Sequence, residues 1–166
     1  MEIPKLKISL GRDEMIKPAY RYGALITAIY DADTIICDID VFNNMWKKNE
    51  IIRLYGINAQ EIRRSASKGI DADDVKVGFD HRDALIKTLG LNPDGFSRKV
   101  RYHKLDKPVW VVIETIKDTS GKFGRLLGII HKGKVNVNEH MRDIIGGVEF
   151  YDGQEYPHDY PIRPPS

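Results

Sequence analysis

Three strand-like runs joined by short connections constrain the fold of this chain more than any other feature. The first spans Gly23 to Tyr30, and the second, rich in β-branched residues, spans Thr34 to Val41. Asp31-Ala-Asp turns the chain between them, and we expect a loop over residues 42–49 before a third strand from Glu50 to Gly56. Consecutive strands with short connections usually pair with their neighbours. The pattern therefore predicts an antiparallel meander.

A helix is predicted next. Asp71 is suited to cap its first turn, and Gly90 is suited to end it. Apolar residues recur at three- and four-residue multiples along one stripe, namely Val75, Phe79, Ile86 and Leu89. Gly78 lies inside this pattern and weakens a helix by roughly 1 kcal/mol relative to alanine. Two interpretations follow, a helix that begins at Asp71 and a shorter one that begins nearer Asp80.

Two more strands and a second helix complete the pattern, at Pro108–Ile116, Arg125–His131 and Asn138–Ile145. Five strands, with a helix between the third and fourth and another at the C-terminal end, give the element order of an OB-type barrel, an α+β or mainly β fold. Such barrels often bind oligonucleotides or oligosaccharides, and the fold does not choose between them. We expect the domain to span residues 23–151, between an irregular lead-in over 1–22 and a proline-rich tail over 152–166.

Composition narrows the class of protein. A chain of 166 residues is long enough for one domain with its own core. No run approaches 18 apolar residues, and the start lacks the apolar region of a secretory signal, so we expect an intracellular protein with no membrane span. The single cysteine, Cys37, lies in a β-branched run and is expected to be a small core residue.

Charge is nearly balanced overall, with 26 Lys and Arg against 24 Asp and Glu, but it is unevenly distributed. The basic segment over residues 98–107 interleaves cations with an aromatic residue, and its candidate nucleic-acid contacts are Arg98, Lys99, Arg101, Tyr102 and Lys104. Cations can follow a nucleic-acid backbone while an aromatic ring stacks on a base. A solvated strand edge protected by lysines explains the segment equally well.

The run from Ile51 to Glu61 carries the most informative polar residues. Arg53 is predicted on the strand face opposite Ile52, and Gly56 permits a turn that carries Asn58 and Glu61 beyond the sheet. Taken alone, this arrangement is more typical of solvated surface than of a site. Its meaning depends on the other segments that meet it.

Three separated motifs together resemble the staphylococcal nuclease (thermonuclease) family. They are Asp31-Ala-Asp-Thr, Arg53-Leu-Tyr-Gly-Ile-Asn-Ala-Gln-Glu and Gly121-Lys-Phe-Gly-Arg. The family patterns are Asp-Gly-Asp-Thr, Arg-Leu-x-Gly-Ile-Asp-x-Pro-Glu and Tyr-Gly-Arg at the start of the fifth strand. The resemblance covers residues 23–150 and implies an OB-type barrel that hydrolyses DNA or RNA to products ending in 3′-phosphates.

The resemblance also implies roles for individual residues. Asp33 and Asn58 would be side-chain ligands of a divalent cation, most simply Ca²⁺, with the backbone carbonyl of Ala59 as a further ligand and Asp31 as an acidic neighbour. Glu61 would activate or orient the attacking water. Arg53 and Arg125 would bind the scissile phosphate.

Three departures from the family pattern affect these expectations. Ala32 replaces a glycine, which matters if that residue needs a positive φ, and Gln60 replaces the proline before Glu61. Asn58 replaces an aspartate, so the metal site keeps an oxygen ligand but loses a formal charge. Weaker metal binding, another ion such as Mg²⁺ or Mn²⁺, and lost activity are all compatible with this change.

The sequence therefore predicts a metal-dependent nuclease, with two alternatives. One is an OB-type module that binds nucleic acid without cleaving it, which Asn58 favours. The other is a protein-interaction barrel that uses its proline-rich tail. Arg53, Glu61 and Arg125 together favour the enzyme, since a binding module has no need of a carboxylate beside a phosphate site.

Overall fold

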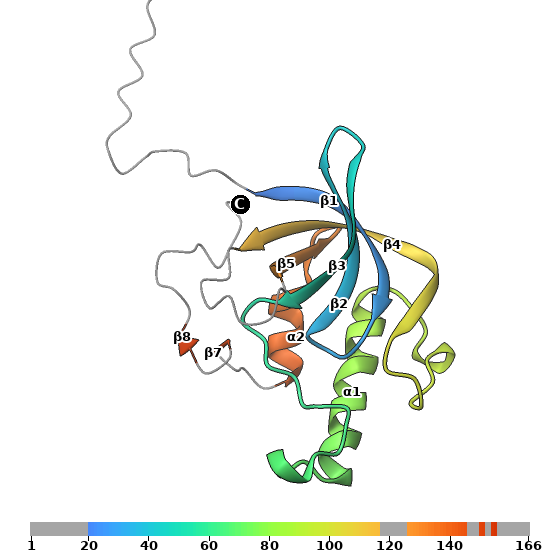
Figure 1. Ribbon diagram of the computed structural model, residues 1–166, viewed down its shortest axis with the longest axis vertical. Helices are drawn as coiled ribbons and strands as arrows, with labels where there is room; N and C mark the ends of the chain where they lie inside the picture. The colour runs from blue at the N-terminus through green and yellow to red at the C-terminus, as the bar shows by residue number, and fades with distance from the viewer. Residues whose placement is uncertain (1–19, 117–125, 146–149, 152–153, 156–166) are drawn as a thin grey trace, which may run out of the picture.

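The computed structural model describes residues 20–116, 126–145, 150–151 and 154–155, which form an α+β fold with a partly closed sheet. The main strands are β1 (Arg21–Ile29), β2 (Thr34–Phe42), β3 (Met45–Leu54), β4 (His103–Ile116), β5 (Leu126–Lys132) and β6 (Val135–Asn136). Their order is β3-β2-β1-β4-β5-β6, with antiparallel neighbours. A parallel pairing of β3 with β5 closes the sheet into a ring (Figure 1).

The α-helices are α1 (Ala72–Thr88) and α2 (Val137–Ile145). Two short 3-10 helices are η2 (Ala66–Lys68) and η3 (Pro93–Gly95). A separate two-stranded sheet pairs β7 (Phe150–Tyr151) with β8 (Gln154–Glu155). Both α-helices lie at one end of the ring, and the β2–β3 hairpin projects from the other (Figure 1). The predicted meander and the helix between the third and fourth strands are present. The main sheet has six strands where five were expected, because the chain after β5 adds the two-residue strand β6.

The connection between β2 and β3 corrects one prediction. A loop was expected over residues 42–49, whereas the structure has a tight hairpin and β3 begins at Met45. Asn43 and Asn44 form the turn with φ angles of 43° and 66°. Asparagine adopts this left-handed region more readily than most residues, and two such residues in succession match the turn that a twisted hairpin prefers.

Helix α1 has the longer of the two predicted extents. Asp71 accepts hydrogen bonds from the backbone N–H groups of Asp73 and Asp74, while the Asp74 side chain accepts one from the Asp71 N–H. This reciprocal cap fixes the first turn, so the interpretation with a start near Asp80 is wrong. Those same backbone donors lower the pKa of the Asp71 carboxyl.

The core fills the ring and continues onto both helices. Its fully buried members include Ile26, Ile35, Ile52 and Ile113 from the strands, Leu85, Ile86 and Leu89 from the α1 region, and Val137 and Met141 from α2. Of the predicted helix stripe, Phe79, Ile86 and Leu89 are buried, and Val75 is partly exposed. Cys37 is buried in this core, as expected, and burial raises the pKa of its thiol well above the usual range.

One asparagine ties the closing strands to α2. Asn138 is 5% exposed, and its Oδ1 accepts a hydrogen bond from the Ile130 N–H at 2.9 Å. Its Nδ2 donates to the carbonyls of Tyr55 and Gly128, both at 2.9 Å. A single side chain from α2 therefore satisfies one backbone group just after β3 and two within β5.

Some predictions fall outside the described part of the chain. These concern Arg125 with its preceding motif, nearly all of the lead-in 1–22 and most of the tail 152–166. Where boundaries can be compared, β1 begins at Arg21 and β4 at His103, earlier than predicted. Within the described residues, no helix is long and apolar enough to cross a membrane.

Candidate active site

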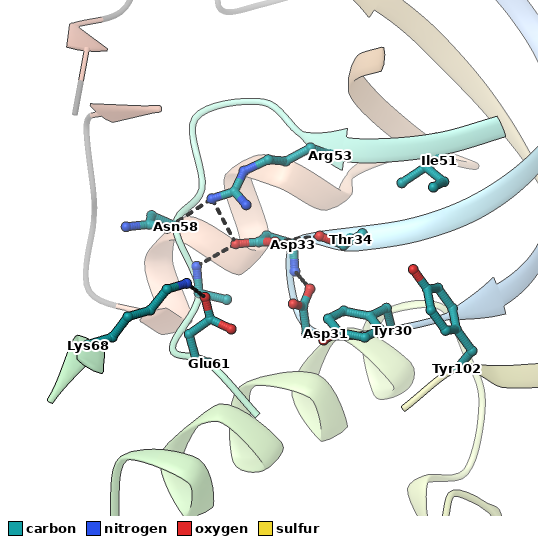
Figure 2. A pocket seen from close by; sticks show the side chains of 11 residues that line it. Tyr30, Asp31, Asp33, Thr34, Ile51, Arg53, Asn58, Glu61, Lys68 and Tyr102 are labelled. Atoms are coloured by element: carbon teal, nitrogen blue, oxygen red, sulfur yellow. Dashed lines mark hydrogen bonds and ion pairs between the residues drawn. The ribbon is translucent and has the colours of Figure 1, made fainter. Parts of the chain in front are cut away.

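A cleft of about 510 Å³ opens where the β1–β2 turn meets the end of β3. Its lining combines acidic, basic and aromatic side chains from the β1–β2 turn, the start of β2, β3, the segment after β3, η2 and the residue before β4. These residues are Tyr30, Asp31, Asp33, Thr34, Ile51, Arg53, Asn58, Ala59, Glu61, Lys68 and Tyr102 (Figure 2). The cleft brings together two of the three motifs found in the sequence. The third motif, which ends at Arg125, lies outside the described residues.

The β1–β2 turn places the two aspartates. The N–H groups of Tyr30 and Asp31 both donate to the carbonyl of Thr34, at 3.0 and 3.4 Å, and the Asp33 N–H donates to Asp31 Oδ1 at 3.1 Å. Ala32 is fully buried and is not among the described residues with a positive φ. Alanine therefore fits this turn without strain, and its replacement of the family glycine has no conformational cost.

Asp33 is the centre of the hydrogen-bond network. Its Oδ1 accepts from the Thr34 hydroxyl at 2.8 Å, and its Oδ2 accepts from the Ala59 N–H at 2.8 Å. Arg53 Nη2 lies 3.3 Å from the same Oδ2. The Asp33 side chain is almost fully buried, so this network holds one carboxylate in one orientation at the base of the cleft.

Arg53 lies on the β3 face opposite the core, as predicted, yet it is only 9% exposed. It contacts Asp33, and its Nη2 also donates to Asn58 Oδ1 at 2.9 Å. The structure thus excludes the alternative in which Arg53 is simply solvated. Gly56, with a φ of 75°, makes the turn that returns Asn58 toward β3.

Glu61 faces the cleft together with a lysine that the sequence did not single out. Lys68 Nζ lies 3.3 Å from Glu61 Oε1, and both side chains remain well exposed, at 65% and 43%. Lys68 belongs to the basic stretch over residues 62–69, between Glu61 and α1. Its position depends on η2 and on a bridge between Ser65 and Ile70, which no local pattern indicated.

Gly78 explains how the segment carrying Glu61 lies so close to α1. A Cβ at position 78 would lie 2.4 Å from the Glu61 carbonyl oxygen and 2.7 Å from that of Gln60. Only glycine permits this approach of the loop to the helix. The residue that weakened the helix prediction is therefore a packing residue of the site.

The acidic end of the cleft carries unfavourable charge. Burial, together with the neighbouring Asp33 carboxylate, raises the pKa of Asp31 well above its usual value. The side-chain atoms available as metal ligands at this end are carboxylate and amide oxygens, which suit a hard divalent cation. The described residues contain no group of three or more His, Cys, Asp or Glu residues that could hold a metal ion. Any cation here would depend on Asn58 or on backbone oxygens.

Two features bear directly on the expected ligands. Arg53 Nη2 already contacts both Asp33 and Asn58, the two expected side-chain ligands. Ala59 meets Asp33 through its N–H, whereas the resemblance implies a role for its carbonyl oxygen. In this arrangement the guanidinium balances the charge of Asp33, and a bound cation would have to compete with it.

The basic segment divides into two parts. Arg98 Nη2 lies 3.1 Å from Asp80 and 3.0 Å from Asp83, and its guanidinium lies over the Phe79 ring. These contacts join the segment to α1. The other four candidate nucleic-acid contacts are exposed, namely Lys99, Arg101, Tyr102 and Lys104. Of these four, Tyr102 lines the cleft.

Protein-family models, curated proteins and solved structures were compared with the chain, and none matched.

Proposed function

We propose that the chain is a metal-dependent nuclease built on an OB-type barrel, and that it hydrolyses phosphodiester bonds of DNA or RNA by an activated water. One observation carries this proposal. Asp33 from one motif and Arg53 and Glu61 from another face the same cleft, as the resemblance to the staphylococcal nuclease family requires. The order of strands and the parallel β3–β5 pairing support the barrel assignment.

The arginine and the glutamate would have complementary roles. A phosphodiester gains negative charge as water attacks, so a cation aimed at its non-bridging oxygens stabilises the transition state more than the ground state. Arg53 suits this role because a guanidinium stays protonated and can donate to two oxygens. Glu61 would accept a proton from the attacking water or orient it. Lys68, next to Glu61, is a second cation within reach of the phosphate.

A divalent cation would be held by Asp33 and Asn58, with the Ala59 carbonyl as a candidate third donor. When bound, such an ion supplies Lewis-acid polarisation of the phosphate. Calcium is the first expectation, and the missing charge at Asn58 keeps Mg²⁺ and Mn²⁺ as alternatives. We also retain Arg125 as the second phosphate-binding arginine.

A nucleic-acid-binding module without hydrolysis is the second candidate function. It is favoured by the contacts of Arg53, whose guanidinium already contacts both Asp33 and Asn58. A cleft of this kind could bind a phosphate through Lys68 and exposed basic residues. Binding of this kind does not require a metal ion or an activated water.

Digestion of plasmid DNA and single-stranded RNA by the purified chain distinguishes the two functions. Each substrate is incubated with Ca²⁺, Mg²⁺, Mn²⁺ or excess chelator, with Arg53→Ala prepared in parallel as a control for contaminating nucleases. We expect cleavage with at least one ion and none in chelator. Undiminished cleavage in chelator overturns the metal requirement, and binding without cleavage under every condition supports the module.

A further inference from the structure

The end of the cleft away from Asn58 and Lys68 is aromatic, and the proposed hydrolysis does not use it. Tyr30 and Tyr102 both line the cleft, with ring centroids 4.8 Å apart and planes inclined at 46°. Strand pairing explains their contact. Ile29 is opposite His103 in the antiparallel β1–β4 ladder, so the residue after Ile29 and the residue before His103 are neighbours.

The two tyrosines present a surface to the cleft. Tyr102 is 43% exposed, and Tyr30, whose ring contacts it, is partly buried. Figure 2 shows both rings and Ile51 on one side of Asp31 and Asp33, with Asn58, Glu61 and Lys68 on the other. Ile51 is partly exposed and adds an apolar side chain to the aromatic end. The cleft therefore has an apolar end and a charged end, where Arg53 and Lys68 lie beside carboxylates.

The two ends match the two parts of a nucleotide. A phosphate is bound by guanidinium and ammonium groups, and a base stacks on an aromatic ring. The volume of about 510 Å³ falls within the range that accommodates small organic ligands. Burial raises the pKa of the Tyr30 hydroxyl, a shift that the nearby Arg101 opposes and that Asp31 and Glu61 increase, so charges of both signs lie near the rings.

We propose that the aromatic end is a nucleobase subsite, in which one unpaired base stacks on Tyr102, supported by Tyr30, while its phosphate lies at Arg53 and Lys68. This assignment rests on the proposed function and extends it to a substrate class. A base within a duplex has both faces covered by its neighbours, and entry into the cleft requires unstacking it. The preferred substrate is therefore single-stranded nucleic acid, or an unpaired segment of a longer molecule.

Binding measured without metal tests the subsite separately from hydrolysis. Fluorescence anisotropy in excess chelator compares three labelled ligands of equal length: an oligothymidylate, the same strand in a duplex, and an abasic sugar-phosphate oligomer. The proteins are the parent, Tyr102→Ala, Tyr102→Phe and Phe42→Ala. Phe42 is a matched control, an aromatic residue that is 72% exposed at the hairpin at the far end of β2.

The parent is expected to bind the oligothymidylate at least tenfold more tightly than the duplex or the abasic oligomer. Tyr102→Ala should lose roughly tenfold in affinity for the oligothymidylate and nothing for the abasic oligomer, whereas Tyr102→Phe and Phe42→Ala should bind like the parent. Thermal melts of each variant identify any loss that comes from unfolding.

Equal affinity of parent and Tyr102→Ala for the oligothymidylate would overturn the subsite, even if the chain cleaves nucleic acid. Tyrosine-dependent binding without cleavage in the digestion assay would overturn the nuclease and leave the subsite standing.

Discussion

Asp33 links the two chemical roles of the cleft. It is bound by the Thr34 hydroxyl, the Ala59 N–H and the Arg53 guanidinium, so its orientation is fixed before any ligand arrives. Preorganisation of this kind lowers the cost of assembling a site during the reaction. Arg53 therefore has two roles: it holds the Asp33 carboxylate, and it is the proposed hydrogen-bond donor to the phosphate. Replacing Arg53 affects both.

Removal of the reacting groups should lower turnover. Arg53→Ala, Glu61→Ala and Arg125→Ala are each expected to reduce the cleavage rate by about 10²-fold or more, because each removes a positioned donor or the water acceptor. The measurement is the initial rate at saturating metal, with circular dichroism to verify folding. Arg63→Ala is the control, since Arg63 is exposed and does not line the cleft. A parent-like rate for any of the three variants would remove that residue from the mechanism.

Asn58→Asp should tighten Ca²⁺ binding by about tenfold, because charged ligands raise the affinity of oxygen sites. Repulsion from Asp33 would oppose the change in the metal-free protein, yet Arg53 Nη2 lies within reach of both side chains and should offset most of it. Calorimetric titration with Ca²⁺ and thermal melts with and without the ion separate these effects. Asn44→Asp adds the same charge at the distant hairpin and serves as the control. Equal affinities of parent and variant would show that position 58 does not contact the metal.

The sequence identified the polar residues of the cleft that lie next to recognisable turns. Asp31, Asp33, Asn58 and Glu61 all flank breaks in strand patterns, where a short-range signal exists. Lys68 and Tyr30 gave no such signal, because their positions come from η2 and from the pairing of β1 with β4. Arg53 was assigned to the correct face of β3, opposite Ile52. Its burial depends on Asn58 and Asp33, which lie five and twenty residues away in the sequence.

At the scale of elements, the contact of α1 with the segment before it is the least expected feature. A glycine in a helix usually signals weakness, and here it permits the backbone of Gln60 and Glu61 to pack against the helix. The strong cap at Asp71 keeps the first turns helical despite the glycine. Sequence patterns predict the helix and its apolar stripe. They do not predict the contact of Gly78 with the backbone of Gln60 and Glu61, which depends on the tertiary structure.

Gly78→Ala tests that contact. Helix propensity alone predicts a gain of about 1 kcal/mol, whereas a Cβ 2.4 Å from a backbone oxygen predicts a net loss of about 1 to 3 kcal/mol. We expect lower stability and a slower cleavage rate, because the segment carrying Glu61 must move. Urea denaturation and initial rates provide the two measurements. Gly95→Ala is the control, since a Cβ at Gly95 meets nothing within 4 Å. A stabilised Gly78→Ala variant would contradict the close packing.

At the scale of the whole molecule, the sheet closes at the strand that carries Arg53, which pairs with Leu127 of β5. The β3–β5 pairing joins residues more than seventy positions apart, and Asn138 supports it through the Tyr55 and Gly128 carbonyls. The element order was readable from hydrophobic patterns. Closure was expected from the OB-type analogy, and the asparagine that stabilises it had no local signature, because its three partners lie on other elements.

Asn138→Ala should destabilise the protein by about 2 to 4 kcal/mol, because it leaves one buried N–H and two buried carbonyls without this partner. Thermal and urea unfolding measure the change. Asn136→Ala is the matched control, because the Asn136 side chain accepts one hydrogen bond, from the Glu139 N–H at the start of α2, and its loss should cost about 1 kcal/mol. If the two variants lost the same stability, Asn138 would have no special part in closure.

The burial of Cys37 gives the molecule its own reporter of breathing motions. The thiol is the chain's single cysteine, lies on β2 and is enclosed by the core. A thiol reagent can reach it only when β2 or its neighbours separate, and the reactive thiolate is scarce while the thiol stays enclosed. The rate of modification by such a reagent therefore measures how often the sheet opens around β2, without any engineered label, in the same preparations used to assay the cleft.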